Sequence, residues 1–191
     1  MRPDQTMAHE SSKTPTPKVR AYLAVSADGF VADSSGGVGF LDEYHGQDLG
    51  YDAFIATVDA LVMGRRTYDQ VRGFGPWPYA DRPAWIITSR PLESPPPAAR
   101  AAAPDPGAVL AQAAAAGCRS VWLVGGPAAI ALFDQADLID TWELTIVPHR
   151  LGAGLPLFTT PRPARLKLER AADHPCGVVQ LDYAVQRTHG N

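Results

Sequence analysis

The chain has 191 residues, of which 46% are hydrophobic and 19% charged, and its formal net charge is −3. This size and composition predict one globular domain with a real hydrophobic core, and the weak negative charge argues against a surface for nucleic acid or anionic membranes. The two cysteines, Cys118 and Cys176, lie far apart and form neither a disulfide framework nor a metal-ligand spacing, which fits a reducing, cytoplasmic compartment.

The first seventeen residues are rich in Ser, Thr, Pro and charged side chains. We therefore expect a disordered tail over residues 1–17 and a folded domain over residues 18–191. The tail has no apolar core of the kind found in signal peptides, and no apolar run in the chain approaches membrane-spanning length. The five histidines are scattered without a His-x-x-x-His pair, so we expect no metal site.

The first half of the domain alternates short apolar runs with turns. A helix is expected over residues 51–58, where Tyr51, Phe54, Ile55 and Val58 share one face at helical spacing. A second, short helix is expected over 67–71, after a turn at Gly64. The apolar runs predict strands over residues 19–26, 60–63 and 84–88, with a brief apolar return over 30–32.

In the second half, Asp105 and Pro106 form a good N-cap and first-turn pair for an alanine-rich helix that Gly117 closes. Pro127 opens another helix, which runs to about Gln135. Strands are expected over residues 120–124 and 141–147, and an antiparallel pair over 164–171 and 178–186 ends the chain.

This order of elements predicts an α/β fold. We expect a central, eight-stranded, mostly parallel sheet with an antiparallel C-terminal strand pair and about four flanking helices. Such sheets bind their ligands at the carboxyl ends of the strands. Three predicted strands end in turns rich in glycine, hydroxyl or arginine side chains, at 64–67, 89–90 and 125–127. Together these turns indicate a phosphate-bearing ligand that lies across the sheet.

The motifs of the chain resemble those of the dihydrofolate reductase superfamily. They are Ala-Val-Ser-Ala-Asp-Gly-Phe-Val-Ala at 24–32, Met-Gly-Arg-Arg-Thr-Tyr at 63–68, Thr-Ser-Arg at 88–90, Val-Gly-Gly at 124–126 and the run at 140–158 that ends in Gly-Leu-Pro-Leu-Phe. Their order is most similar to the reductases related to the C-terminal domain of RibD, the bacterial bifunctional deaminase-reductase. The resemblance spans roughly residues 18–187.

This resemblance implies a dihydrofolate reductase-like fold with NADPH bound across the sheet. It places Ala24, Val31 and Ala32 beside the nicotinamide, and Ser89 and Arg90 near the adenosine 2′-phosphate. It also implies a cis peptide between Gly125 and Gly126. The pyrophosphate and adenosine side would be held by two further groups of residues, namely Gly64, Arg65, Arg66 and Thr67, and Val124, Gly125, Gly126, Pro127, Ala128 and Ala129.

The implied activity is transfer of a hydride to a small pteridine-like or pyrimidine-like heterocycle, related to 5-amino-6-(5-phosphoribosylamino)uracil reductase of riboflavin biosynthesis. Two features separate the chain from the riboflavin enzymes proper. Those enzymes lack the Gly-Arg-Arg-Thr-Tyr motif, and this chain has no deaminase domain with zinc ligands. The alternatives are a nucleotide-binding protein without efficient catalysis and a true dihydrofolate reductase. The family often pairs through its C-terminal strands, so we also expect a homodimer.

The substrate half of the site is less defined by the sequence. The resemblance implies an acidic residue in the first helix that assists protonation of the substrate. An ungapped count back from Gly64 places it at Asp48, whereas a gapped count leaves Gly50 there, so Asp48 and Asp52 are alternative candidates for the acid that delivers a proton. The candidates for contacts with the substrate are Asp28, Tyr51, Phe54 and Trp77.

Overall fold

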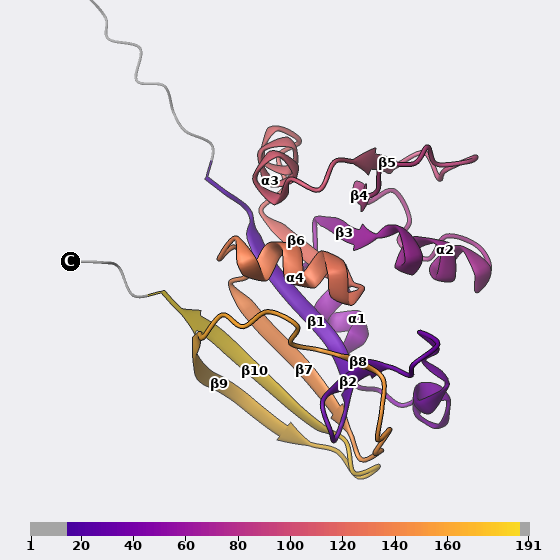
Figure 1. The fold of residues 1–191 in the computed structure, drawn as a ribbon, viewed down its shortest axis with the longest axis vertical. Helices are drawn as coiled ribbons and strands as arrows, with labels where there is room; N and C mark the ends of the chain where they lie inside the picture. Colours follow the sequence, from indigo (N-terminus) through magenta and orange to yellow (C-terminus); the bar gives the residue numbers. More distant parts are fainter. Residues whose placement is uncertain (1–14, 188–191) are drawn as a thin grey trace, which may run out of the picture.

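The structure is a computed structural model that describes residues 15–187, so the predicted tail lies almost entirely outside the described residues. Its centre is an eight-stranded sheet with the order β5-β4-β3-β6-β1-β7-β10-β9 (Figure 1). The strands are β1 (Lys18–Ser26), β3 (Ala60–Gly64), β4 (Ala84–Ile87), β5 (Ala99–Ala102), β6 (Ser120–Gly125), β7 (Thr141–Val147), β9 (Arg165–Asp173) and β10 (Val179–Gln186).

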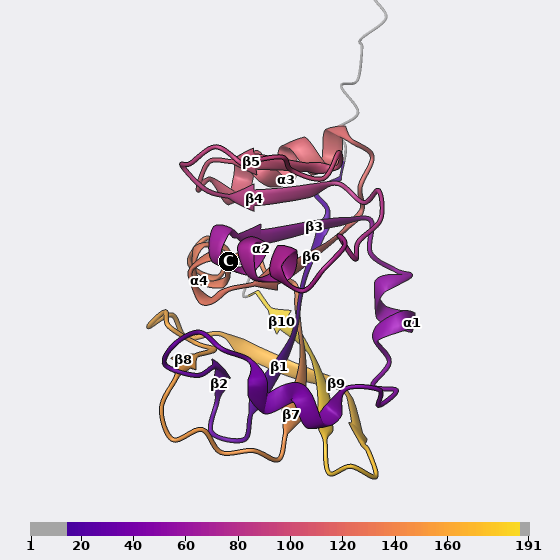
Figure 2. The same cartoon turned by 90° about the vertical axis from the view of Figure 1, so that its right-hand side faces the viewer.

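All pairs from β5 to β7 are parallel, and β10 pairs antiparallel with both β7 and β9. The predicted mostly parallel sheet with an antiparallel C-terminal pair is therefore confirmed. Figure 2 shows how the sheet twists between β5 at one edge and β9 at the other. A separate two-stranded sheet joins β2 (Phe30–Ala32) to β8 (Leu155–Pro156).

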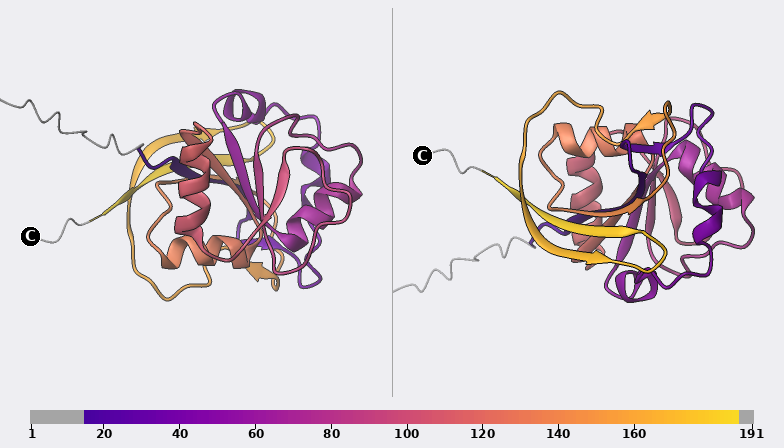
Figure 3. Two further views of the ribbon diagram at one scale, coloured as in Figure 1. Left: turned by 90° about the horizontal axis from the view of Figure 1, so that it is seen from above. Right: turned by 90° about the horizontal axis from the view of Figure 1, so that it is seen from below.

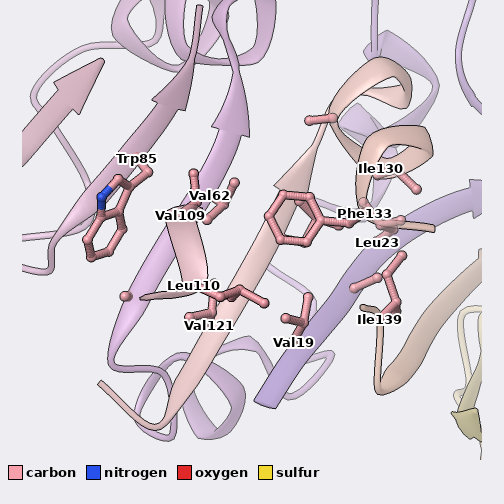
Figure 4. Close-up of a cluster of buried hydrophobic side chains, with 14 of the residues drawn as sticks. Val19, Leu23, Val62, Trp85, Val109, Leu110, Val121, Ile130, Phe133 and Ile139 are labelled. Atoms are coloured by element: carbon pink, nitrogen blue, oxygen red, sulfur yellow. The ribbon is translucent and has the colours of Figure 1, made fainter. Parts of the chain in front are cut away.

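Helices cover both faces of the sheet (Figure 3). One face packs against α3 (Pro106–Ala115) and α4 (Pro127–Gln135), whose Val109, Leu110, Ile130 and Phe133 meet β-strand side chains such as Val62 and Val121 (Figure 4). The other face packs against α1 (Tyr51–Ile55) and α2 (Arg65–Gly73) through Phe54 and Tyr68. No helix within residues 15–187 is long and apolar enough to cross a membrane.

Local signals account for most of these elements. As predicted, Asp105 caps α3, and its Oδ1 accepts a hydrogen bond of 2.9 Å from the Ala108 N–H. The helix predicted over residues 51–58 ends earlier, at Ile55, because both the backbone N–H and the hydroxyl of Thr57 donate to the Phe54 carbonyl. The 3₁₀ helix at Gly39–Tyr44 and the strands β5 and β8 have no counterpart in the prediction.

Candidate active site

A cavity of about 770 Å³ opens where the carboxyl ends of β1, β3 and β6 meet the starts of α2 and α4. This is the edge of a parallel sheet at which ligands usually bind. Most residues that the sequence assigned to a cofactor lie together in its lining. These are Ala24, Val31, Ala32, Gly64, Arg65, Arg66, Thr67, Val124, Gly125, Gly126, Pro127, Ala128 and Ala129.

One end of the cavity is formed by the first turns of α2 and α4. Their N-cap residues are Gly64 and Gly126, and no side chain within residues 15–187 caps either helix start. The two starts lie close together, since a Cβ on Gly126 would come within 3.1 Å of Thr67 Oγ1 and one on Gly64 within 3.8 Å of the Gly126 nitrogen. Helix N-termini carry free N–H groups and positive potential, so this end suits an anion. The peptide between Gly125 and Gly126 is cis, as predicted.

The two arginines at the start of α2, Arg65 and Arg66, differ in how firmly they are held. Arg65 Nε donates to Asp69 at 2.8 Å, and its Nη1 donates to the Pro91 carbonyl at 3.0 Å. Arg66 is exposed, and its hydrogen bond to the Ser35 carbonyl is long, at 3.4 Å. Both line the cavity, but Arg66 has more donor capacity left for a ligand.

Ser89 and Arg90 follow β4 and lie outside the lining of the cavity. Both are exposed, and the backbone N–H of Arg90 donates to Thr88 Oγ1 at 3.0 Å, which closes a local turn. Their assignment to a 2′-phosphate remains a prediction.

The other end of the cavity is aromatic, with Tyr22, Tyr51 and Trp122 in its lining. Tyr22 stacks on Phe54 with ring centroids 4.0 Å apart, and Trp122 meets the edge of Tyr22 at 6.0 Å. The indole N–H of Trp122 is occupied, since it donates to the Tyr22 carbonyl at 3.0 Å. Neither Tyr22 nor Trp122 was among the predicted site residues. The period of two along β1, which puts Tyr22 on the same face as Ala24, is the signal that could have found Tyr22.

Of the four predicted substrate contacts, Tyr51 lines the cavity, and Asp28, Phe54 and Trp77 do not. Phe54 is buried behind Tyr22, where it supports the aromatic end from outside the lining. Trp77 packs against Tyr68 and Tyr79, on the side of the sheet that α1 and α2 cover.

Asp28 holds two loops of the site together. Its carboxylate accepts hydrogen bonds from the Ser26 hydroxyl at 2.7 Å and from the backbone N–H groups of Leu151 and Gly152 at 3.1 and 2.7 Å. Desolvation raises the pKa of Asp28, but these hydrogen bonds outweigh it and lower the pKa to about 2. The side chain therefore stays ionised and fixes the β1–β2 turn to the loop before β8.

The two candidate proton donors also lie outside the lining. Asp48 accepts a hydrogen bond of 3.1 Å from the Gly50 N–H, and Asp52 is exposed in the first turn of α1. Both positions are typical of carboxylates at a helix start. Among the described residues that line the cavity, none is an aspartate or a glutamate.

The titratable side chains at the aromatic end are therefore phenols. Burial raises the pKa of Tyr22; a hydrogen bond with Thr145 acts against this rise, and the charge of Glu143 adds to it. Burial also raises the pKa of Tyr51. Both groups remain protonated near neutral pH and can act as hydrogen-bond donors. Within residues 15–187, no cluster of three or more His, Cys, Asp or Glu side chains is arranged to hold a metal ion.

Comparisons with known proteins agree on the family. A family model described as "RibD C-terminal domain" matches residues 17–180. An uncharacterized protein of Bacillus subtilis (strain 168), YwjB, is 34% identical over 143 residues, which are 74% of this chain and 82% of that protein.

Solved structures give the same picture. A putative riboflavin biosynthesis protein from Shewanella sp. PV-4 superposes with a TM-score of 0.80 at 28% identity and covers 89% of this chain and 99% of its own. A Thermotoga maritima diaminohydroxyphosphoribosylaminopyrimidine deaminase/5-amino-6-(5-phosphoribosylamino)uracil reductase superposes with a TM-score of 0.68 at 14% identity, over 90% of this chain and 57% of its own. At that identity the likeness concerns the fold alone.

Proposed function

Because the chain belongs to the RibD C-terminal domain family, we propose that it is an NADPH-dependent reductase that transfers a hydride to a small planar heterocycle. The observation that carries the proposal is a cavity with two chemically different ends. Two uncapped helix starts and two arginines form one end, and an aromatic wall forms the other. An anionic dinucleotide with a flat substrate beside its nicotinamide would match both ends.

The donor set of the chain fits the cofactor. The backbone N–H groups at the starts of α2 and α4 would bind the pyrophosphate, and Arg66 would neutralise part of its charge. Ala24 and Ala32 present small side chains to the cavity, which leaves room for a ring against the sheet. Bound NADPH would supply the hydride, and the protein would orient the reactants and exclude water.

The absence of a carboxylate among the described lining residues favours one alternative. A nucleotide-binding protein with the same cleft would need no proton donor and would bind NADPH without efficient turnover. The same absence argues against a true dihydrofolate reductase, because an acidic residue in the first helix assists protonation of the pteridine in those enzymes.

A titration followed by tryptophan fluorescence tests cofactor binding. Trp122 lines the cavity, so NADPH is expected to quench its emission, and NADH is expected to bind more weakly. No quenching by either cofactor would contradict the proposal, and equal affinities would contradict the 2′-phosphate assignment. Loss of NADPH absorbance with 5-amino-6-(5-phosphoribosylamino)uracil or with dihydrofolate then tests turnover. Binding without turnover across such a panel would favour the alternative.

A further inference from the structure

Two phenols could give a proton to a substrate at the aromatic end, and their settings differ. Tyr51 is 39% exposed and lies at the start of the five-residue helix α1. Tyr22 lies on the central strand β1, stacked on Phe54 and flanked by the edge of Trp122. A donor that packing holds on several sides orients a substrate better than an exposed one. Tyr22 is therefore the stronger candidate.

The position of Tyr22 along β1 also suits this role. Tyr22 and Ala24 are two residues apart, so their side chains leave the same face of the sheet, about 7 Å apart. Both line the cavity. If the nicotinamide lies beside Ala24, the next planar group along the sheet would lie beside Tyr22.

A buried polar cluster supports the Tyr22 hydroxyl from behind. Gln180 is 6% exposed, and its Nε2 donates to the Leu49 carbonyl at 2.7 Å and to Thr145 Oγ1 at 3.2 Å. Its Oε1 lies 3.0 Å from His174 Nε2. Thr145 in turn acts on the Tyr22 hydroxyl, since it opposes the rise of the Tyr22 pKa. Buried polar groups with all partners in place rigidify the groups that they touch.

The phenolic hydrogen of Tyr22 is held by one long hydrogen bond. It points to the Leu49 carbonyl at 3.4 Å, a long hydrogen bond, and that carbonyl already accepts the much shorter bond from Gln180. If the hydrogen turned to a substrate acceptor, the Leu49 carbonyl would keep a partner. No buried acceptor would be left unsatisfied, so the exchange has a small cost.

We propose that Tyr22 is the catalytic hydrogen-bond donor of this site and that it protonates the heteroatom of the substrate bond that is reduced. The inference rests on the proposed function. A C=N bond of the heterocycle or its side chain accepts the hydride of NADPH at carbon, and its electron pair moves to nitrogen. That nitrogen takes the phenolic proton, and the phenolate regains a proton from water. The sum is substrate, NADPH and one proton, which give reduced substrate and NADP⁺.

The test compares Tyr22→Phe with Tyr79→Phe. Tyr79 is buried in the same aromatic cluster and meets Trp122 edge-on at 5.7 Å, but it lies outside the cavity lining, so its substitution controls for the loss of a buried hydroxyl. The probe is 5-amino-6-(5-phosphoribosylamino)uracil. We expect the probe to bind the NADP⁺ complex of Tyr22→Phe about fivefold more weakly than that of wild type, as for one lost hydrogen bond. The rate of NADPH oxidation should fall about 10²-fold.

The pH dependence separates proton donation from a structural role. The charged and titratable groups that act on Tyr22 are Glu143 of β7, Asp182 of β10 and Tyr51 of α1, and His174 lies one contact further away, against Gln180. Glu143 and Asp182 lie outside the cavity lining, and Tyr51 lines the cavity together with Tyr22. With Tyr22 present, the rate should stay flat around neutral pH. In Tyr22→Phe the proton must come from water, so the rate should fall as pH rises.

The outcomes distinguish this inference from the proposed function. If Tyr22→Phe binds and reduces the probe like wild type, or if the wild-type NADP⁺ complex does not bind the probe, the inference is overturned. The proposed function stands in either case if NADPH quenches the fluorescence and is oxidised with another heterocycle. Gln180→Leu gives a second variant should Tyr22→Phe not fold. Without Gln180 the Tyr22 hydrogen must satisfy Leu49, so the same loss of rate is expected with unchanged NADPH affinity.

Discussion

The two ends of the cavity are built by different means. At the end formed by α2 and α4, the backbone makes the site, because two helices begin there without a side-chain cap. The contrast with α3 is informative, since Asp105 caps α3 and that helix takes no part in the lining. Where the chain leaves a helix start open beside a cavity, an anionic ligand can complete it.

At the aromatic end, side chains from separate segments make the site. Tyr22 comes from β1, Tyr51 from α1 and Trp122 from β6, and Phe54 and Gln180 support them from outside the lining. The backbone-built end would recognise what many nucleotides share, namely phosphate. The side-chain-built end would decide which heterocycle is accepted. Variants at the two ends should therefore separate cofactor binding from substrate recognition.

The largest effect on NADPH affinity is expected from Gly64→Val. The backbone of Gly64 is extended, at φ −73° and ψ 159°, so valine fits it, and the added Cβ would lie 3.8 Å from the Gly126 nitrogen. The side chain would then cover the N–H groups that an anion needs. We expect NADPH affinity to fall roughly 10- to 100-fold, as for lost charge-assisted hydrogen bonds, measured by fluorescence titration. Gly73→Ala, at the other end of α2 with open space around it, is the control. Unchanged affinity in Gly64→Val would show that the helix starts do not bind the cofactor.

A smaller effect is expected from Arg66→Ala. Within residues 15–187, the hydrogen bond that Arg66 would lose is the long one of 3.4 Å to the Ser35 carbonyl, so the fold should tolerate its removal. We expect the affinities for NADPH and NADH to fall by the same factor, roughly tenfold, if Arg66 contacts the pyrophosphate that both cofactors carry. Arg72→Ala removes a charge from the same helix outside the cavity and is the control. A loss of affinity for NADPH alone would indicate that Arg66 contacts the 2′-phosphate and not the pyrophosphate.

Phe54→Leu probes the support of the aromatic end. It removes the ring that stacks on Tyr22 at 4.0 Å and lies under the Arg20 guanidinium at 4.5 Å. We expect the free energy of unfolding in urea to fall by about 1 kcal/mol, and NADPH affinity to stay within about twofold of wild type. A large loss of NADPH affinity would contradict the separation of the two ends. Met63→Leu, a buried change of similar size in the same cluster, is the matched control.

The sequence predicted the backbone-built end well because that end depends on local signals. Glycines at 64, 125 and 126 and Pro127 mark the ends of strands and the starts of helices, and they act within a few residues of themselves. Their convergence then follows from the parallel order of the strands. The same locality explains why β3, β4, β6, α3 and α4 were predicted with nearly correct bounds, although β5 was not predicted.

The aromatic end was harder to predict, because its contacts join residues that are far apart in the sequence. Gln180 reaches Leu49 across 131 positions, and Trp122 reaches Tyr22 across 100. An aromatic residue in an apolar run is also typical of the core, so the alternation along β1 puts Tyr22 on the face of Ala24 without showing that its ring lines a cavity. Asp28 was predicted to contact the substrate, but its carboxylate accepts hydrogen bonds from the backbone N–H groups of residues 151 and 152. This contact also joins residues far apart in the sequence.

The smallest effect is expected from Asp28→Asn, and it concerns the frame of the site rather than either end. The pKa of Asp28 is lowered from 3.8 to about 2 in the folded chain, so the ionised form favours folding. This contribution to stability is fully present above 3.8, the pKa of Asp28 in the unfolded chain, and it is lost as the pH falls from 3.8 to about 2. Asparagine cannot gain it. We therefore expect Asp28→Asn to unfold at a slightly lower Tm than wild type near neutral pH, with the difference shrinking as the pH falls toward about 2.

Asp33→Asn is the control for a local turn, because within residues 15–187 the hydrogen bonds of the Asp33 carboxylate reach no further than Gly37. Asp28→Asn should leave NADPH affinity unchanged. If it weakened NADPH binding as strongly as Gly64→Val, the link between the β1–β2 turn and the loop before β8 would belong to the cofactor end. The cavity could then no longer be divided into two independent ends.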